Sequence, residues 1–209
     1  MLVKYPRTPH LPYSQGMTND DRVLRSDSHF YDMSEIIVTE KMDGENCTLY
    51  KDYIHARSLN SKHHESRAWI KQLWNNIKNE IPSTFRVCGE NLFAKHSIYY
   101  EGLESYFLVF SIWDNNKCLS WDDTIQWVEL LNLKTVPVLY KGKYSSNLLS
   151  ICFTGQSQHK GEQEGFVVRN SSEFEFDDFD KNMAKFVRKN HVQTSQHWMS
   201  QQITQNQCI

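Results

Sequence analysis

Short runs of β-branched and aromatic residues, separated by polar turns, occur along most of the chain and predict many strands. Strands are predicted over 35–41, 85–91, 105–114, 134–142, 164–170 and 182–190. Segment 46–58 predicts one or two further strands, with a turn at Lys51 and Asp52. The first 30 residues are rich in Pro, Ser, Asp and Asn, so they predict a loop with little regular structure.

Two segments have the spacing of helices. Segment 65–82 carries its apolar residues on one face, namely Ile70, Leu73, Trp74, Ile77 and Ile81, and Pro82 ends the pattern. In segment 120–133, Ser120 can cap the helix, and acidic residues follow in its first turn. Two helices among many strands, without regular alternation of the two, predict an α+β fold with mainly antiparallel sheets.

A length of 209 residues suits one domain with a sizeable core. No apolar run reaches the roughly 18–20 residues that a membrane-spanning helix needs, and the first ten residues lack the layout of a signal peptide. The five cysteines are scattered and form no Cys-x-x-Cys pair. This usage predicts reduced thiols and a cytoplasmic protein, and it gives little support to a zinc site.

The charged residues are unevenly distributed although the net charge is only −2. Segment 171–180 holds five acids and no base. Basic residues gather in two stretches, at Lys51, Arg57, Lys62, Arg67 and Lys71, and at Lys181, Lys185, Arg188 and Lys189. This pattern fits a solvated surface as well as a nucleic-acid-binding one, so charge alone does not decide between them.

The stretch EKMDGEN, residues 40–46, places an amine beside carboxylates and a flexible backbone point. A lysine becomes a good nucleophile when its surroundings lower its pKa, and we expect a depressed pKa for Lys41. Gly44 lets the backbone approach a ligand closely, and Asp43, Glu45 and Asn46 could bind ligand hydroxyls or metal-bound water. The stretch alone is a weak signal, because it is also typical of a β-turn.

Residues 40–46 resemble motif I of the covalent nucleotidyltransferases, the superfamily of polynucleotide ligases and mRNA capping enzymes. Later stretches resemble its other motifs in the expected order, namely RVCGEN with Glu90, YFLVFSI with Phe110, EGFVV with Glu164 and AKFVR with Lys185. Within the superfamily, KYPRTPHLP (4–12) and KFVRKNHVQTSQHW (185–198) look like ATP-dependent RNA ligases of the phage RNA ligase 2 type and their small bacterial relatives.

This resemblance implies a chemistry with a covalent intermediate. In that family a lysine attacks the α-phosphate of ATP, pyrophosphate leaves, and the AMP then passes to an RNA 5′-phosphate before an RNA 3′-hydroxyl displaces it. By resemblance Lys41 is the nucleophile, and Lys185 neutralises charge on the α-phosphate. Glu164 orients Mg²⁺ or Mn²⁺ through water, and Glu90 holds the ribose or a water on the metal.

The resemblance also implies contacts to the nucleotide. Glu40 would read the adenine edge, Phe110 would stack on the adenine, Asn46 would contact the nucleotide, and Arg57 would contact ribose or phosphate. Arg169 would touch phosphate as well. Each residue also has an ordinary structural alternative, such as a surface charge or, for Phe110, a core side chain.

The sequence departs from the family pattern at two places. Ser111 stands where the family usually has aspartate. Val187 stands where motif V often has a second lysine, and Arg188 follows it. Whether Arg188 takes over from that lysine stays open, because regular alternation would send it to the opposite face from Lys185.

The resemblance implies a nucleotidyltransferase (adenylation) domain over 1–209, with antiparallel sheets flanked by helices, a loop-rich segment 1–30 and a short tail 190–209. Because only 20 residues follow Lys189, we expect no OB-fold domain. We expect a monomer that repairs nicked duplex RNA or paired RNA ends, with room for an RNA-repair partner protein. A DNA or mixed-strand ligase and a non-catalytic nucleotide- or RNA-binding module of the same fold are the alternatives.

Overall fold

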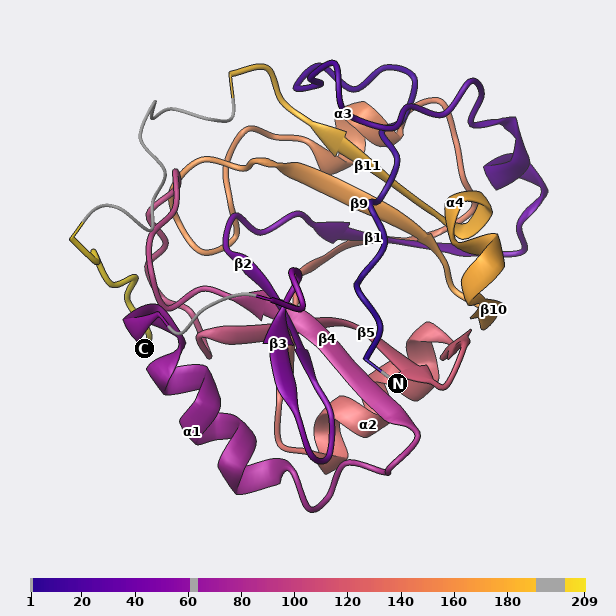
Figure 1. Ribbon diagram of the computed structural model, residues 1–209. Helices are drawn as coiled ribbons and strands as arrows, with labels where there is room; N and C mark the ends of the chain where they lie inside the picture. The colour runs from indigo at the N-terminus through magenta and orange to yellow at the C-terminus, as the bar shows by residue number, and fades with distance from the viewer. Residues whose placement is uncertain (1, 61–63, 191–201) are drawn as a thin grey trace.

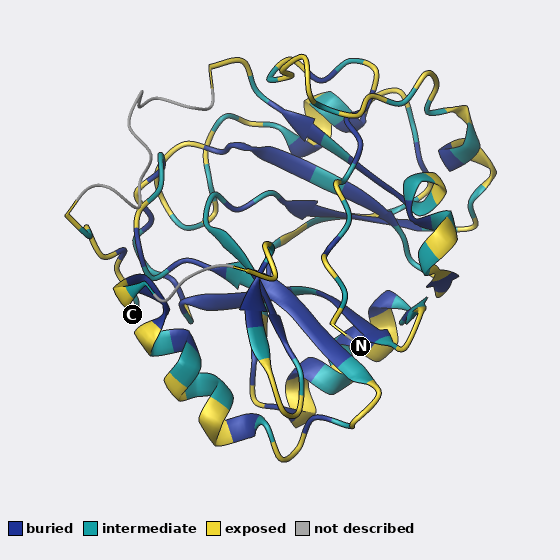
Figure 2. Ribbon diagram, in the orientation of Figure 1, coloured by how far each residue is buried: buried dark blue, intermediate teal, exposed yellow. Residues whose placement is uncertain are grey.

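The computed structural model describes residues 2–60, 64–190 and 202–209, which form two sheets facing each other (Figure 1). The first sheet has the antiparallel order β11-β9-β1-β8, with bounds Met183–Val187, Gly165–Asn170, Ile36–Glu40 and Val138–Gly142. Strands β1, β9 and β11 are mostly buried (Figure 2), and they share a core with the N-terminal segment through Leu11 and Phe30.

The second sheet has the order β10-β6-β5-β4-β2-β3. The strands lie at Phe174–Glu175, Lys117–Cys118, Phe107–Asp114, Phe85–Asn91, Glu45–Leu49 and Ile54–Ala56. A short strand, β7 (Lys134–Thr135), pairs with β5 in parallel, and the other pairs in both sheets are antiparallel. The predicted α+β fold with mainly antiparallel sheets is therefore confirmed.

Two longer helices, α1 (Ala68–Ile77) and α2 (Trp121–Leu130), pack on the second sheet (Figure 1). The backbone N–H of Asp123 donates to the Ser120 hydroxyl oxygen at 3.1 Å, so the predicted cap of α2 is present. Shorter helices lie at Leu148–Cys152 (α3) and Phe179–Asn182 (α4), with 3₁₀ turns at Ser28–Asp32, Glu65–Arg67 and Phe176–Asp178.

The helix predicted over 65–82 is shorter than expected at both ends. It begins with the 3₁₀ turn, and the α-helix ends at Ile77. The residue before a proline is disfavoured in the α conformation, so Pro82 acts on Ile81 and the chain leaves the helix in a turn closed by Glu80 N–H and the Ile77 carbonyl. Ile81 is still 1% exposed, so the apolar pattern identified a core residue beyond the helix.

The strand predicted over 134–142 is split between the two sheets. β7 pairs with β5 of the second sheet, and β8 pairs with β1 of the first. Pro137 lies between them and has no N–H to donate, but its carbonyl accepts from the Glu40 N–H at 2.8 Å. A proline inside a strand pattern thus marks the point where the chain crosses from one sheet to the other.

Both ends of the described chain are tied to the body of the protein. Leu11 N–H donates to the Lys185 carbonyl at 2.8 Å, and Lys185 N–H donates to the Pro9 carbonyl at 2.9 Å, so the N-terminal segment pairs with the edge of β11. Near the other end, Asn206 is 2% exposed and its side chain bonds the backbone of Leu92 and Tyr100. The predicted loop at the start is therefore irregular but firmly docked.

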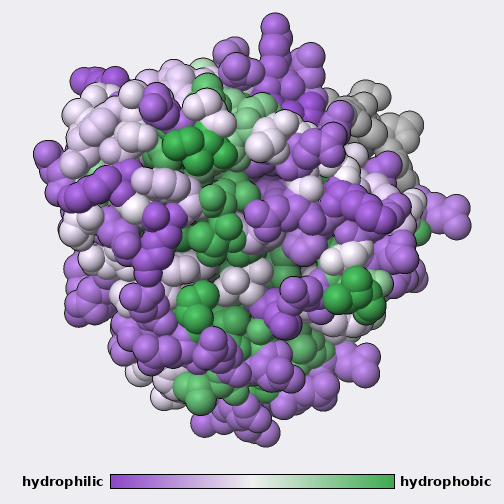
Figure 3. Space-filling model, turned by 180° about the vertical axis from the view of Figure 1, so that it is seen from behind, coloured by the Kyte–Doolittle hydropathy of each residue, from purple (hydrophilic) through white to green (hydrophobic). Residues whose placement is uncertain are grey.

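The thiols and the surface of the described residues agree with an ordinary folded domain. All five cysteines are free. None of the helices in the described part of the chain has both the length and the apolar character that crossing a bilayer requires. On the face opposite to Figure 1, hydrophobic side chains form small patches divided by hydrophilic ones (Figure 3). Lys62 and residues 191–198 of the ligase-like stretch lie outside the described residues.

Candidate active site

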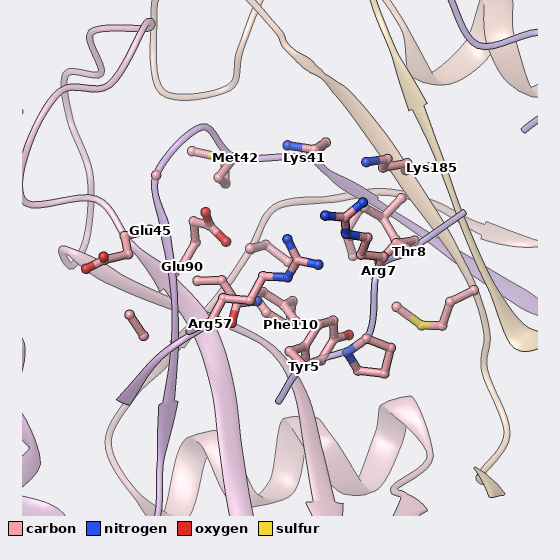
Figure 4. Close-up of a pocket in the computed structure, with 18 of the residues that line it drawn as sticks. Tyr5, Arg7, Thr8, Lys41, Met42, Glu45, Arg57, Glu90, Phe110 and Lys185 are labelled. Atoms are coloured by element: carbon pink, nitrogen blue, oxygen red, sulfur yellow. The ribbon is translucent and has the colours of Figure 1, made fainter. Parts of the chain in front are cut away.

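A cavity of about 790 Å³ lies between the two sheets and is the place where the predicted site residues meet (Figure 4). Its lining includes eight of them: Glu40, Lys41, Asn46, Arg57, Glu90, Phe110, Arg169 and Lys185. The ninth, Glu164, contacts Lys41 directly. Predicted site residues that are far apart in the chain therefore line one cavity. Glu40 and Lys185, for example, are separated by 145 positions.

The strand register of the first sheet explains this grouping. In β1 and β9, Glu40 lies opposite Phe166, and Lys41 N–H donates to the Gly165 carbonyl at 3.0 Å just beyond the strand. In β9 and β11, Lys185 lies opposite Val167. The end of β1, the start of β9 and the middle of β11 thus lie side by side, and their side chains reach the same end of the cavity.

Lys41 and Glu164 form a close, largely buried ion pair. Lys41 Nζ donates to Glu164 Oε2 at 2.6 Å, and the two side chains are 26% and 6% exposed. Burial lowers the pKa of Lys41, but the carboxylates of Glu164 and Glu90 outweigh burial and raise that pKa above its ordinary value. The predicted depressed pKa is therefore wrong, because the neighbouring acids stabilise the charged form of the amine.

The two acids beside Lys41 are themselves perturbed. Burial raises the pKa of Glu90 to about 8, and although Lys41 opposes this, the charges of Glu164 and Asp43 add to it. Burial also raises the pKa of Glu164, against the effect of Lys41. Burial and mutual repulsion thus disfavour two charged carboxylates at this place, and a divalent cation would stabilise both charged forms.

The protein groups could hold this cation only loosely. Within residues 2–60, 64–190 and 202–209, no three side chains of His, Cys, Asp or Glu converge on one point as metal ligands. An ion at Glu90 and Glu164 would therefore keep most of its water, which is the usual state of Mg²⁺ at sites that it shares with phosphates. The residues present fit a hydrated Mg²⁺ or Mn²⁺.

Lys185 supplies a second cation at the same end of the cavity. Its side chain is 20% exposed, and its Nζ lies 3.9 Å from Asp21 Oδ1. Burial lowers the pKa of Lys185, and the positive charge of Lys41 lowers it further. The two lysines are therefore close enough to act on one ligand, and a negative group between them would relieve their repulsion.

The opposite wall combines an aromatic face with two arginines. Phe110 is half-buried, and its ring makes an edge contact with Tyr5 at 5.1 Å between centroids. Figure 4 shows Arg57 and Arg7 above these rings, with their guanidinium groups between Phe110 and Lys41. Burial lowers the pKa of Arg57, and the charge of Arg7 lowers it further. This wall offers a flat apolar surface beneath concentrated positive charge.

Two buried acceptors in the cavity lack a partner among the described residues. Glu40 is 1% exposed, and its Oε2 accepts from Gln158 N–H at 3.1 Å, but its Oε1 has no hydrogen bond. The Oδ1 atom of Asn46 is also buried without one. Because unsatisfied buried acceptors are costly, these two atoms indicate a ligand that donates hydrogen bonds to them.

Similarity to known proteins shows the family of this chain. The model of the family described as RNA ligase matches residues 34–187, which is most of the chain. The chain belongs to the RNA ligase family. No match is found among curated protein sequences.

Solved structures of one RNA ligase have the same fold as this family member. The chain is similar to Naegleria gruberi RNA ligase with PPi, at 17% identity and a TM-score of 0.55, over 90% of this chain and 58% of that one. It is also similar to a mutant of that ligase with AMP and Mn, at 16% identity and a TM-score of 0.56, over 88% and 57%. The chain thus spans less than two thirds of those proteins. The likeness confirms the nucleotidyltransferase fold, while the phage RNA ligase 2 subgroup stays a prediction.

Arg169 and Arg188, which were considered for the site from their positions in the sequence, form hydrogen bonds or ion pairs with other protein groups. The Arg169 guanidinium donates to the carbonyls of Leu119, at 2.8 Å, and Asn170, at 3.0 Å, although the residue borders the cavity. Arg188 pairs with Glu162 and is not among the residues that line the cavity. Arg169 Nη1 is buried without a hydrogen-bond partner among the described residues, so the phosphate contact expected of Arg169 stays a prediction. Arg188 is not part of our proposal.

Sequence reasoning missed the contribution of the N-terminal segment. Tyr5, Arg7, Thr8 and Asp21 line the cavity, although the first 30 residues were expected only to form a loop. The available signal was the resemblance of residues 4–12 to RNA ligases, which carries no role for any one residue. No local pattern could show that this loop folds over the cavity, because the contacts that hold it are made with β11 and β5.

Proposed function

We propose that this protein is an ATP-dependent RNA ligase that seals RNA 3′-hydroxyl and 5′-phosphate ends through an AMP carried on Lys41. The observation that supports it most is the 2.6 Å contact between Lys41 Nζ and Glu164 Oε2 inside a cavity that also contains Glu90 and Lys185. A nucleophilic amine, a proton acceptor and a second cation at one place are what transfer of a nucleotidyl group needs.

In the first step, Lys41 Nζ attacks the α-phosphorus of ATP. A nitrogen–phosphorus bond forms, the bond from that phosphorus to the bridging oxygen breaks, and pyrophosphate leaves. The ammonium must first lose a proton, and Glu164 Oε2 at 2.6 Å is placed to take it. Lys185 balances the charge that grows on the α-phosphate, and Arg57 binds the phosphate chain.

The base and ribose would lie against the unpartnered acceptors and the aromatic wall. Phe110 stacks on the adenine, Glu40 Oε1 accepts from the exocyclic amino group, and Asn46 Oδ1 accepts from a ribose hydroxyl. Glu40 Oε1 and Asn46 Oδ1 would thereby gain hydrogen bonds that no described residue gives them. This set supports adenine as the base, because guanine carries a carbonyl where adenine carries the amino donor.

A divalent ion, Mg²⁺ or Mn²⁺, would be held by Glu90 and Glu164 through water, and it would supply positive charge to the phosphates. In the later steps the AMP passes from Lys41 to an RNA 5′-phosphate, and an RNA 3′-hydroxyl then displaces it as the phosphodiester forms. We place the protein with the phage RNA ligase 2-like enzymes of RNA repair, as a cytoplasmic monomer acting on nicked duplex RNA or paired ends.

The test is the intact mass of the protein after incubation with ATP and either Mg²⁺ or Mn²⁺. The expected result is a gain of one AMP that acid removes, absent in Lys41→Ala and present in Lys51→Ala, a control in the exposed turn between β2 and β3. A protein that gains no AMP with either metal would be a binding module instead. Sealing of matched nicks then separates the substrates: joining of DNA strands as fast as RNA strands would overturn the choice of RNA.

A further inference from the structure

The N-terminal segment holds an arginine over the cavity. Arg7 lines the cavity although it belongs to none of the strands, and the segment is fixed on both sides of it. Before it, Tyr5 is 7% exposed and packs on Phe110 and Phe179. After it, Pro9 hydrogen-bonds to the backbone of β11, as described above. With anchors two residues away on each side, the position of Arg7 is set by the fold.

The guanidinium of Arg7 is available to a ligand. Its Nη1 donates to the Asp20 carbonyl at 3.1 Å, and the residue is exposed. Within the described residues, neither Arg7 nor Arg57 forms an ion pair with a carboxylate. An arginine carries five N–H donors in a planar fork, so most of the donors of Arg7 are still free to bind.

Arg7 and Arg57 lie beside each other with like charge. Figure 4 shows their two guanidinium groups next to each other, between Phe110 below and the two lysines above. The charge of Arg7 lowers the pKa of Arg57, and the charge of Asp21 offsets part of this effect, so a bound anion would relieve the remaining repulsion. The two arginines come from distant parts of the chain, because Arg57 follows β3 while Arg7 belongs to the docked segment.

We propose that Arg7, together with Arg57, binds a phosphate group in the cavity, so that the N-terminal segment completes the phosphate site. The inference rests on the proposed function in one respect, since the phosphate would come either from the β- and γ-phosphates of ATP or from the 5′ end of the RNA. Both sources offer the same chemistry, a dianionic phosphate that accepts paired hydrogen bonds from a guanidinium. Arg7 would then touch the substrate and stabilise its negative charge.

The first test measures binding alone and does not depend on ligase activity. Inorganic pyrophosphate and adenosine are titrated separately into the wild type, Arg7→Ala, Arg7→Lys and Arg25→Ala by calorimetry. Arg25 is an exposed arginine of the same segment that does not line the cavity, so it is the matched control. We expect Arg7→Ala to bind pyrophosphate at least about 10-fold more weakly, with Arg7→Lys between it and the wild type and adenosine binding unchanged.

A second test distinguishes the two sources of phosphate. Single-turnover transfer of AMP from ATP to the protein is compared with single-turnover transfer of that AMP from the adenylylated protein to RNA that carries a 5′-phosphate. A slower first transfer with a normal second one assigns the site to ATP, and a slower second transfer with a normal first one assigns it to RNA. If pyrophosphate binding and both rates in Arg7→Ala stay within about twofold of Arg25→Ala, the inference is wrong.

The outcomes also separate this inference from the proposed function. A wild type that never gains AMP, but loses pyrophosphate binding in Arg7→Ala, would refute the ligase proposal and leave the phosphate site standing. A wild type that seals RNA, with Arg7→Ala equal to it in every measurement, would refute only the role of Arg7. Because Arg7 is exposed and its hydrogen bond within the described residues is to the Asp20 carbonyl, Arg7→Ala should fold normally.

Discussion

The ion pair between Glu45 and Arg67 should be a large contribution to the stability of the protein. Arg67 Nε donates to Glu45 Oε2 at 2.7 Å, and its Nη2 donates to Oε1 of the same carboxylate. The two side chains are only 11% and 8% exposed. The pair joins the start of β2 to the turn before α1, at the wall of the cavity.

Removing one partner leaves the other charge buried. Arg67→Ala would leave the Glu45 carboxylate in a site with little water, at a cost of about 3–5 kcal/mol in the free energy of unfolding. For a chain of this size each kcal/mol lowers the melting temperature by roughly 2–4 °C, so the expected loss is roughly 6–20 °C. The double variant Glu45→Leu with Arg67→Leu buries no charge and should recover most of that loss.

Urea unfolding followed by circular dichroism gives the free energy and the slope for each variant. The matched control is Lys160→Ala, which breaks the exposed pair of Lys160 and Glu101, whose side chains are 76% and 39% exposed. That pair should contribute less than about 1 kcal/mol. The reasoning fails if Arg67→Ala lowers the free energy of unfolding no more than Lys160→Ala does, with the dependence on urea concentration unchanged. Burial would then not decide how much these ion pairs stabilise the protein.

Three further substitutions test the packing, the pH dependence and the cavity wall. Gly165→Ala would place a Cβ 1.9 Å from the Phe186 carbonyl oxygen, so β9 and β11 must separate; we expect a loss of about 3 kcal/mol or more in urea unfolding, and full stability would contradict the packing. Burial and the charge of Lys185 lower the pKa of His10 from 6.5 to about 4. Protonation therefore favours the unfolded state, and His10 alone should remove about 3 kcal/mol of stability as pH falls from 6.5 to 4. A His10→Gln variant should show a correspondingly flatter fall in that window, and an equal fall would reject the assignment. Phe110→Ala should weaken binding of AMP by about 1–3 kcal/mol in calorimetry if the ring stacks on adenine, whereas unchanged binding would make Phe110 a packing residue only.

The sequence allowed many strands to be predicted from local patterns, and most cavity residues from the resemblance to family motifs. A short run with β-branched and aromatic residues located β4 at the predicted bounds, 85–91, and the ordered motifs placed Lys41, Glu90 and Lys185 around one site. Those motifs carry information about neighbours in space, which periodicity does not. Phe110 shows the difference, since periodicity alone could not distinguish a core ring from one that faces a ligand.

The properties that could not be predicted depend on contacts between distant segments. Arg67 belonged to a basic stretch that fitted a solvated surface, but the structure buries it against Glu45, 22 positions earlier. The pKa of Lys41 depends on Glu90 and Glu164, which reach it from two different sheets. Sequence spacing gives neither the distance between such charged groups nor their burial. These two quantities set the sign and the size of a pKa shift.

The raised pKa of Lys41 is compatible with a nucleophilic role once the whole cavity is considered. The nearby carboxylates raise the pKa of Lys41, so they stabilise the ammonium form, which cannot attack. A divalent ion bound with the phosphate chain would bring positive charge to those same carboxylates and weaken their stabilisation of the ammonium form. Under the proposed function, Glu164 Oε2, which lies 2.6 Å from Lys41 Nζ, would then accept the proton. The amine would thus become reactive only with ATP and its metal ion bound, so acids that disfavour attack in their absence can belong to the same site as the attacking nitrogen.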